Sequence, residues 1–224
     1  MLRYIYANDL KNFPILQDSM FRHRAAQFRD RLNWAVCVDE KGWERDEYDL
    51  LNPLYVIWEN EDGTHGGSMR FLPTTGRTMI NDHFVHLTEG VRIQSPLIWE
   101  CTRFCLAPDA DRRITARLVI AAGEVMENFC LEHFVGVFDP RMERIYSLLG
   151  VNPDVIGRSG EGAEEIGVGL WEFIEGARER VHGRAQVTQE QSRRWFREAF
   201  GHQVTRPVIA PAPNTVERKQ FALA

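Results

Sequence analysis

The sequence predicts an α/β fold, with a mixed central sheet and helices on both of its faces. Short strand-like runs alternate along the chain with long segments whose apolar residues recur at helical spacing. The order of these segments is β, α, several β, and then α-β-α-β, which is typical of a sheet covered by helices on both sides. The wholly apolar run 134–138 is expected to be a strand in the interior of the sheet.

The first half of the chain begins with a strand pattern and a long helix pattern. Residues 2–6 alternate well enough for an edge strand, and one apolar stripe predicts a helix over 12–32. Residues 35–53 have weak periodicity and many charges, so we expect a long loop, and such loops are usually functional or mobile. A predicted hairpin follows, made by the strands 54–58 and 65–72.

The second half of the chain alternates strands and helices. Residues 73–97 contain several Pro and Gly residues and are expected to be irregular. Asp109 or Asp111 is expected to cap a helix that ends at about 132, and Gly150 to end a shorter helix. The remaining predicted elements are strands over 98–106 and 134–138, a helix over 140–149, strands at 155–156 and 168–174, and a helix over 188–200.

The chain has 224 residues, which is the length of one domain with a tail. We expect the domain to cover residues 1–200. The tail, 201–224, carries Pro207, Pro211 and Pro213 among small and polar residues, so we expect it to be flexible.

The composition is that of an ordinary globular protein, with 44% hydrophobic and 26% charged residues. The formal net charge is −5, so no overall basic excess points to nucleic acid or anionic lipid as a partner. No apolar run approaches the roughly 18–20 residues of a membrane span. The first residues lack the pattern of a signal peptide, and we therefore expect a cytoplasmic protein.

The sequence lacks common metal and nucleotide motifs. Its four cysteines form no Cys-x-x-Cys pair and are expected to be free thiols, because a zinc site made with His133 would have poor spacing. Its seven histidines form no His-x-x-x-His pair, so we expect no metal. A dinucleotide-binding glycine loop, a phosphate-binding loop and the Gly-x-Ser-x-Gly motif of hydrolases do not occur.

Charged residues inside otherwise apolar strand patterns are the most informative feature of the sequence. Strand alternation would place Glu100 and Thr102 on one face of their strand and Arg103 on the other. Buried charges are costly unless they are paired, and the planar group of Arg contacts both oxygens of a carboxylate. We therefore expect a network among Arg24, Arg31, Arg70, Arg103, Asp46, Asp49 and Glu100. The alternative is that these charges only brace the loop against the sheet.

The same residues carry a resemblance to a known family. In chain order they read Arg24-x3-Phe28-x5-Trp34, Asp46-x2-Asp49, Arg70, Phe84 and Glu100-x2-Arg103. Over about residues 1–175 the chain resembles the acyl-homoserine-lactone synthases, which make the diffusible signal of bacterial quorum sensing. No single piece of this set is specific, but the complete ordered set of nine residues is.

The resemblance implies a GNAT-like α/β/α sandwich and an acyltransferase. The substrates would be S-adenosylmethionine and an acyl chain on acyl carrier protein or on coenzyme A. The enzyme would form an amide, close a lactone and release methylthioadenosine, with no cofactor, because S-adenosylmethionine is itself a substrate.

The resemblance also implies roles for individual residues. Glu100 is expected to act as the base for the amine, directly or through water, with Arg103 as the second catalytic residue. Asp49 and Arg70 would hold the ion-pair network together. The S-adenosylmethionine side would be lined by Arg24, Phe28, Arg31, Trp34, Asp46, Phe84 and Arg103.

The acyl chain needs an apolar cavity, and the strand 98–106 and the segments after it offer candidates. They are Met79, Trp99, Thr102, Leu118, Ala122, Met126, Gly136, Phe138, Ile145 and Leu149, each of which is equally expected as plain core. In the family, a threonine at the position of Gly136 often accompanies 3-oxo acyl donors. The glycine here favours an unsubstituted or 3-hydroxy chain.

Acyl carrier protein is acidic, so we expect a basic patch to receive it. The candidates are Arg112, Arg113, Arg117, Arg141 and Arg144, with a solvated helix face as the alternative. Segment 107–112 lacks the Gly-rich pyrophosphate loop of GNAT enzymes, which favours the carrier protein over coenzyme A as the donor.

Three other functions stay open. A GNAT-type N-acyltransferase that uses acyl-CoA and another amine shares the fold but does not explain the set of nine residues. An inactive binding module would be expected to have lost Glu100 or Arg103. A methyltransferase would need the Gly-rich loop that this sequence lacks.

Overall fold

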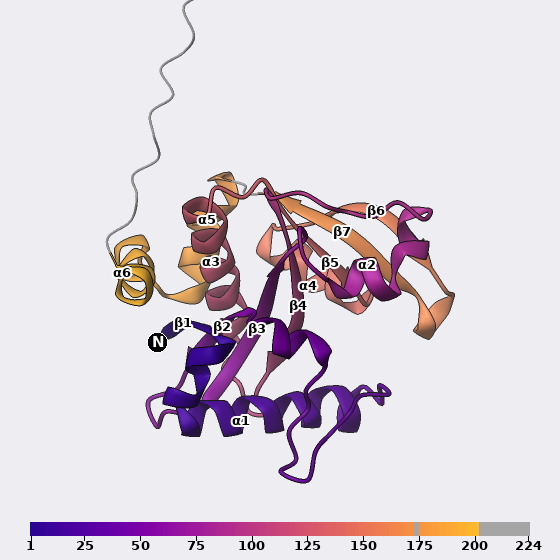
Figure 1. The fold of residues 1–224 in the computed structure, drawn as a ribbon. Helices are drawn as coiled ribbons and strands as arrows, with labels where there is room; N and C mark the ends of the chain where they lie inside the picture. Colours follow the sequence, from indigo (N-terminus) through magenta and orange to yellow (C-terminus); the bar gives the residue numbers. More distant parts are fainter. Residues whose placement is uncertain (173–174, 202–224) are drawn as a thin grey trace, which may run out of the picture.

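A computed structural model describes residues 1–172 and 175–201, so the expected tail, apart from Gly201, and the end of the last predicted strand lie outside the described residues. A seven-stranded mixed sheet runs through the molecule in the order β1-β2-β3-β4-β5-β7-β6 (Figure 1). Among the described residues, neighbouring strands pair antiparallel except β4 and β5, which are parallel. The strands are β1 (Leu2–Tyr6), β2 (Leu54–Glu59), β3 (His65–Pro73), β4 (Ile98–Leu106), β5 (His133–Phe138), β6 (Asp154–Ser159) and β7 (Ile166–Glu172).

Helices cover both faces of this sheet, as the sequence predicts. Figure 1 shows α1 on one side and α3, α5 and α6 on the other. The α-helices are α1 (Pro14–Ala25), α2 (Met79–His83), α3 (Arg113–Asn128), α4 (Arg141–Leu149), α5 (Glu175–Ala185) and α6 (Gln189–Phe200). Shorter 3-10 turns occupy Ala7–Asn12, Glu47–Leu51, Val85–Thr88 and Gly162–Glu164. The predicted α/β/α sandwich with a mixed sheet is confirmed, and β1 does lie at a sheet edge.

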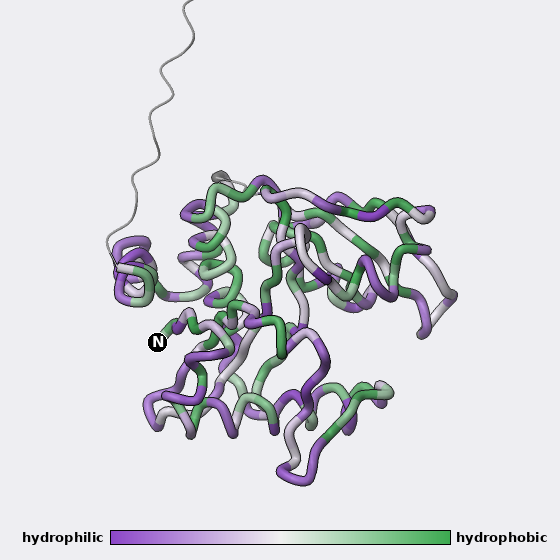
Figure 2. Tube along the Cα trace, viewed as in Figure 1, coloured by the Kyte–Doolittle hydropathy of each residue, from purple (hydrophilic) through white to green (hydrophobic). Residues whose placement is uncertain are grey.

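The two faces of the sheet have separate apolar cores because side chains alternate along each strand. Tyr55 and Ile57 of β2 pack with α1, whereas Leu54 and Val56 pack with α3. Figure 2 shows hydrophobic residues along the strands and α3, and a hydrophilic loop after α1. No helix within the described part of the chain is both long enough and apolar enough to cross a membrane.

Predicted helix boundaries differ from the structure by up to about one turn. The helix expected over 12–32 starts at Pro14, and after Ala25 it becomes a π-helical turn over Ala26–Arg31. The helix expected to end at about 132 ends at Asn128. Arg112 stands directly before this helix and makes no side-chain capping bond, but the predicted cap by Asp111 is confirmed, because its Oδ1 accepts the N–H of Arg113 at 2.9 Å.

The sequence analysis missed α5 altogether. Its buried residues Ala177, Val181 and Ala185 are small and recur every four residues within a strongly charged segment. Such a narrow apolar stripe gives little helical signal on its own. The helix is stabilised instead by its packing on α3.

Strands β4 and β5 stop pairing partway along their length. They pair through Ile98, Trp99 and Glu100, and beyond this point β5 continues to pair with β7. On the other side of β4 the register against β3 shifts by one residue, and Arg103 within that shift has a φ of 53°. This β-bulge and the splayed strands open the centre of the sheet.

Candidate active site

A buried ion-pair network fills the space between α1, the loop after it and the centre of the sheet. Arg24 of α1 is 1% exposed, and its Nε donates to Glu44 at 2.6 Å. Its two Nη atoms donate to the two oxygens of Asp49 at 3.0 Å each. Arg24 therefore fastens α1 to two points of the charged loop.

A second arginine carries the network into the sheet. Arg70 of β3 is fully buried and donates from Nη1 to Asp49 at 2.8 Å and from Nη2 to Asp46 at 3.0 Å. Its Nε donates to Thr102 Oγ1 on β4 at 3.0 Å. The Tyr55 hydroxyl donates to Asp49 at 2.6 Å.

The loop holds its carboxylates in place by local hydrogen bonds. Asp46 and Asp49 form a reciprocal capping box at the start of the turn Glu47–Leu51. The Asp46 side chain accepts from the N–H groups of Tyr48 and Asp49, and Asp49 accepts from the N–H of Asp46. The spacing of three residues between the two aspartates thus serves to cap this turn as well as to bind arginine.

Electrostatics stabilise the charged forms within this network. Burial alone would raise the pKa of the Asp49 carboxyl, but Arg24 and Arg70 beside it hold the pKa well below its usual value. Burial likewise disfavours the charged form of Arg24, and Asp49 and Glu44 outweigh it and raise its pKa. Three arginines, Arg24, Arg70 and the partly buried Arg103, face three carboxylates, Glu44, Asp46 and Asp49, so the formal charges balance.

Arg103 is the arginine of this network that lines a cavity, whereas Arg24 and Arg70 do not. Its Nη2 donates to Asp46 at 2.7 Å and to Glu44 at 3.1 Å. Its guanidinium carbon lies 5.3 Å from the ring centroid of Phe28. The contact of its Nη1 is Met79 Sδ at 3.7 Å, and sulfur is a weak acceptor. Nη1 therefore keeps donor capacity for a substrate.

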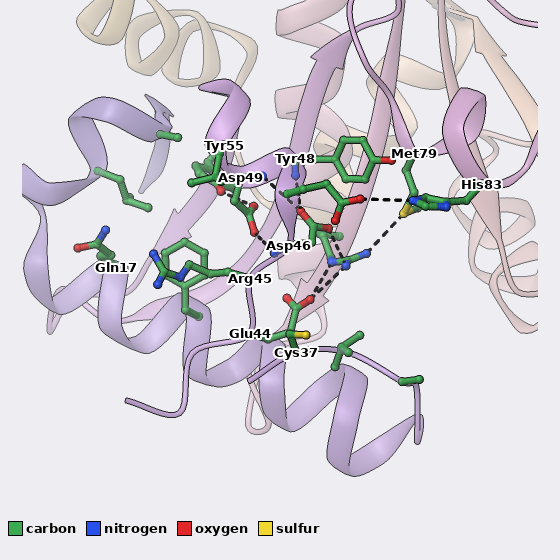
Figure 3. Close-up of a pocket in the computed structure, with 18 residues that line it drawn as sticks. Gln17, Cys37, Glu44, Arg45, Asp46, Tyr48, Asp49, Tyr55, Met79 and His83 are labelled. Atoms are coloured by element: carbon green, nitrogen blue, oxygen red, sulfur yellow. Dashed lines mark hydrogen bonds and ion pairs between the residues drawn. The ribbon is translucent and has the colours of Figure 1, made fainter. Parts of the chain in front are cut away.

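Two cavities meet at Arg103 and Met79. The first, of about 590 Å³, is lined by the acidic loop (Figure 3). Its carboxylates are Glu44, Asp46, Glu47 and Asp49, which come together with Tyr48 and His83. Glu44, Asp46 and Asp49 are already paired with arginines, so the cavity is polar without a large net charge, and its carboxylate oxygens can accept from a polar ligand.

The second cavity, of about 700 Å³, passes through the sheet at the splay between β4 and β5. Phe28 and Thr102 line it on the α1 side, and Met69, Cys101 and Ala122 line it on the α3 side. Gly136 stands at the splay, where a Cβ atom built on it would lie 2.9 Å from the Cys101 carbonyl oxygen. A larger residue there would push the two strands apart.

An aromatic pair stands at one end of the second cavity. The rings of Phe28 and Trp34 are stacked, with centroids 5.1 Å apart and an interplanar angle of 8°. Phe28 is buried, whereas Trp34 is 45% exposed and thus presents a free face. Arg31 lies on the same rim, exposed to solvent.

Glu100 lies elsewhere than the sequence analysis expected. It is 1% exposed and lines neither cavity. Its carboxylate accepts the N–H groups of Met79 at 3.1 Å and Ile80 at 2.6 Å, at the start of α2. Burial raises the pKa of this carboxyl, against the lowering effect of those two N–H groups. Glu100 therefore holds the segment that carries Met79.

The expected face of Arg103 also differs. Simple alternation would place it opposite Thr102, but both side chains contact the same network. The bulge at Arg103 adds one residue to β4 and turns its side chain toward Asp46.

The structure separates the other expected site residues into those that line the cavities and those that do not. Eight of the ten acyl candidates line the second cavity: Met79, Thr102, Ala122, Met126, Gly136, Phe138, Ile145 and Leu149. Leu118 is fully buried in the core, and Trp99 packs on Phe129. Phe84 packs in a separate apolar cluster with Ile80. Arg24 and Arg70 line neither cavity.

The five arginines of the expected basic patch follow β4 and β5, whose parallel C-terminal ends lie at one edge of the sheet. Arg113 and Arg141 are paired with Asp111 and Asp139 beside them in sequence. Arg117 packs on the Trp58 ring at 4.0 Å. Arg112 and Arg144 are exposed.

Sequence reasoning missed Glu44 and a histidine pair. Glu44 is fully buried and pairs with two arginines, yet it sits in a run of loop charges where nothing marks it. His23 and His65 approach through their Nδ1 atoms at 3.0 Å, and Nε2 of His65 lies 2.9 Å from Ser68 Oγ. These two histidines are 42 residues apart, so only the fold brings them together.

Thiol and metal chemistry find little support within the described residues. All four cysteines are free, and Cys101, which lines the second cavity, has its pKa raised to about 12 by burial. No group of three or more His, Cys, Asp or Glu side chains in this part of the chain could hold a metal ion.

Comparisons with known proteins agree with this geometry. A family model described as autoinducer synthase matches residues 8–179. An acyl-homoserine-lactone synthase of Rhizobium etli is 40% identical over 181 residues, which cover 77% of this chain and 84% of that protein.

Solved structures share the fold. BjaI, a CoA-dependent acyl-homoserine lactone synthase solved with SAM and isopentyl-CoA, aligns with a TM-score of 0.75 at 20% identity, covering 84% of this chain and 90% of that chain. LasI, an AHL synthase, aligns with a TM-score of 0.71 at 24% identity, covering 84% and 98%. From the length of the family match and the identity to the Rhizobium etli enzyme, the chain belongs to the autoinducer synthase family, the acyl-homoserine-lactone synthases.

Proposed function

We propose that this acyltransferase joins an acyl chain from a thioester to the amine of S-adenosylmethionine and then closes the homoserine lactone. The observation that carries this proposal is the position of Arg103, which lies where a polar and a largely apolar cavity meet and keeps an Nη1 donor for a substrate carboxylate. A reaction between a charged amino acid and an acyl chain needs such a junction.

The proposed place of S-adenosylmethionine is this junction. Its carboxylate would accept from Arg103 Nη1, and its adenine would stack on the exposed face of Trp34. Its sulfonium and ammonium groups suit the carboxylates of the first cavity, such as Asp46 and Glu47. BjaI was solved with SAM and, in another structure, with MTA. The S-adenosylmethionine is a substrate, and we propose no resident cofactor.

The proposed acyl site is the body of the second cavity. The thioester carbonyl would lie in the splay near Cys101 and Gly136, where β4 and β5 no longer pair and leave backbone groups of both strands open to a ligand. Backbone N–H groups there would stabilise the oxyanion that forms during attack. The alkyl chain would run among Ala122, Ile145 and Leu149.

The proposed chemistry needs only modest assistance. An α-amine has a pKa of about 8, so a useful fraction is neutral near pH 7. The amine attacks the thioester carbonyl, its C–N bond forms as the C–S bond breaks, and the proton leaves with the thiol. The carboxylate then attacks the carbon next to the sulfonium and forms the lactone C–O bond. The C–S bond to that carbon breaks, its electron pair goes to sulfur, and neutral methylthioadenosine leaves. Both steps depend chiefly on positioning.

A direct transfer fits the cavity better than a covalent acyl-enzyme. The cysteine that lines the acyl site, Cys101, has a pKa of about 12 and is therefore a thiol at neutral pH. A thiol is a poor nucleophile compared with a thiolate.

The acyl donor is proposed to be a thioester of either acyl carrier protein or coenzyme A. Exposed Arg112 and Arg144 follow β4 and β5 in the chain and suit an acidic carrier protein, although the pairing of Arg113 and Arg141 with neighbouring aspartates weakens the patch. BjaI is described as CoA-dependent, so both donors belong in the test. A cytoplasmic location, expected from the sequence, agrees with these substrates.

The test is a reconstitution with purified full-length protein, S-adenosylmethionine and a series of acyl carrier protein and acyl-CoA thioesters of increasing length. Mass spectrometry follows methylthioadenosine and the acyl-homoserine lactone. We expect equimolar release of both with at least one donor. An acyl amide without methylthioadenosine would instead identify a GNAT-type N-acyltransferase, and S-adenosylmethionine binding without product from any donor would contradict the proposal.

A further inference from the structure

One wall of the second cavity is formed by α5, a helix that carries none of the expected site residues. Ala177, Arg178, Val181 and His182 line the cavity from this helix. Ala177 and Val181 are 2% and 3% exposed and lie four residues apart, so they occupy one face of α5. This face is turned toward the cavity.

Helix α5 closes the cavity between α3 and α4. Arg178 forms ion pairs with Glu124 and Glu127 of α3, at 3.5 and 2.9 Å. At the other side, the guanidinium of Arg180 lies against Gly150, the residue that ends α4. The helix is therefore fastened at both sides of the space that it covers.

The wall faces the apolar part of the cavity. Ala122 and Met126 of α3 and Ile145 and Leu149 of α4 line the same space. Arg103 and the splay of the strands mark the reacting end, and the arginine belongs to the α1 side of the sheet. A thioester placed at the splay must direct its alkyl chain away from Arg103 and toward the helices that include α5.

We propose that Ala177 and Val181 of α5 determine which acyl chain lengths this enzyme accepts. Small side chains at these two positions leave the cavity room for a medium or long saturated chain. The inference rests on the proposed function and adds the residues that would set its acyl-chain specificity.

The test compares two narrowing variants, Val181→Phe and Ala177→Leu, with the unchanged full-length enzyme. Each is assayed for kcat/KM with a series of saturated acyl thioesters that differ by two methylenes. We expect the optimum to move to shorter donors, with at least a tenfold loss for the longest donor and less than a threefold loss for the shortest. The widening variant Val181→Ala should leave short donors unchanged. Each methylene that loses its contact lowers kcat/KM by about fourfold.

Arg184→Ala is the matched control, because Arg184 is exposed on the same helix. An equal loss for all donors in the narrowing variants, or no change in the preferred length, would overturn the inference. Circular dichroism and thermal unfolding of each variant separate a folded enzyme with altered preference from an unfolded one, and Ala177→Val replaces a variant that does not fold. If the unchanged enzyme uses no donor at all, the proposed function fails rather than this inference.

Discussion

Arg103 donates to Asp46 across 2.7 Å although its own backbone is in the left-handed region, with a φ of 53°. A non-glycine residue in this conformation carries strain, and such strain persists where the surrounding contacts require it. Here the bulge turns Arg103 toward Asp46 and Glu44 and places its Nη1 at the junction of the two cavities. The β-bulge in β4 therefore sets the position of the Arg103 guanidinium at this junction.

Arg103→Lys should lower kcat/KM by about 100-fold with little loss of stability. A lysine ammonium is a point charge that cannot contact Asp46, Glu44 and a substrate carboxylate in one plane, and loss of a buried charge pair costs on this scale. Steady-state methylthioadenosine release measures the effect. The control is Arg29→Lys, whose ion pair with Asp30 is on the surface. A kcat/KM within threefold of the unchanged enzyme would refute the assigned role.

Asp49→Asn should lower the free energy of unfolding by about 3–5 kcal/mol, because the neutral amide no longer balances the positive charges of the buried Arg24 and Arg70. Urea unfolding measures this loss, and the control Asp30→Asn, on the surface, should leave the free energy of unfolding almost unchanged. Since the pKa of Asp49 is depressed, its contribution is complete above the unfolded value of about 3.9 and is lost as the pH falls below it. Equal costs for the two variants would show that the network is not stabilising.

Glu100→Gln should lower kcat/KM by roughly tenfold at every pH. Gln has an NH2 group in place of one carboxylate oxygen, so the N–H of either Met79 or Ile80 would face a donor instead of its present acceptor. A general base would behave differently, because raising the pH through 8 would deprotonate the amine without help and restore activity. The pH profile of kcat/KM from pH 6 to 9 decides between these roles, and recovery at high pH would reinstate Glu100 as the base.

The histidine pair should make the fold sensitive to mild acid. Burial lowers the pKa of His65 well below its usual value, and burial also lowers the pKa of His23, so both bind a proton less readily in the folded protein than in the unfolded chain. The unfolded chain binds these protons below about pH 6.5, so stability is complete above that value and falls below it. The slope is at most about 1.4 kcal/mol per pH unit for the fully buried His65, and it is smaller for the half-exposed His23.

Thermal unfolding between pH 7.5 and 5.5 measures this slope. His65→Gln should flatten it, whereas His86→Gln, at an exposed position, should leave it unchanged. A slope that survives in His65→Gln would assign the acid sensitivity to other groups.

The sequence by itself determined the layers of the fold and most members of the ion-pair network. Strand alternation and the apolar stripe of α3 are periodic patterns within short segments, so the sequence predicts them without knowledge of the fold. Arg70 is recognisable because a charge within an apolar strand pattern must find a partner, and Arg24 and Asp49 are recognisable because arginine and carboxylate side chains pair readily. Of the ten acyl candidates that this reasoning named on β4 and the neighbouring segments, eight line the cavity.

Only the tertiary structure decided which way Arg103 points, what Glu100 binds and that α5 closes the cavity. The direction of Arg103 depends on a bulge, and the register of β4 against β3 sets that bulge. Glu100 is bound by two N–H groups that lie 20 and 21 residues away in sequence. Helix α5 has a weak pattern of its own and is held by ion pairs to α3. Each of these features results from pairing between distant segments, and no local period in the sequence encodes such pairing.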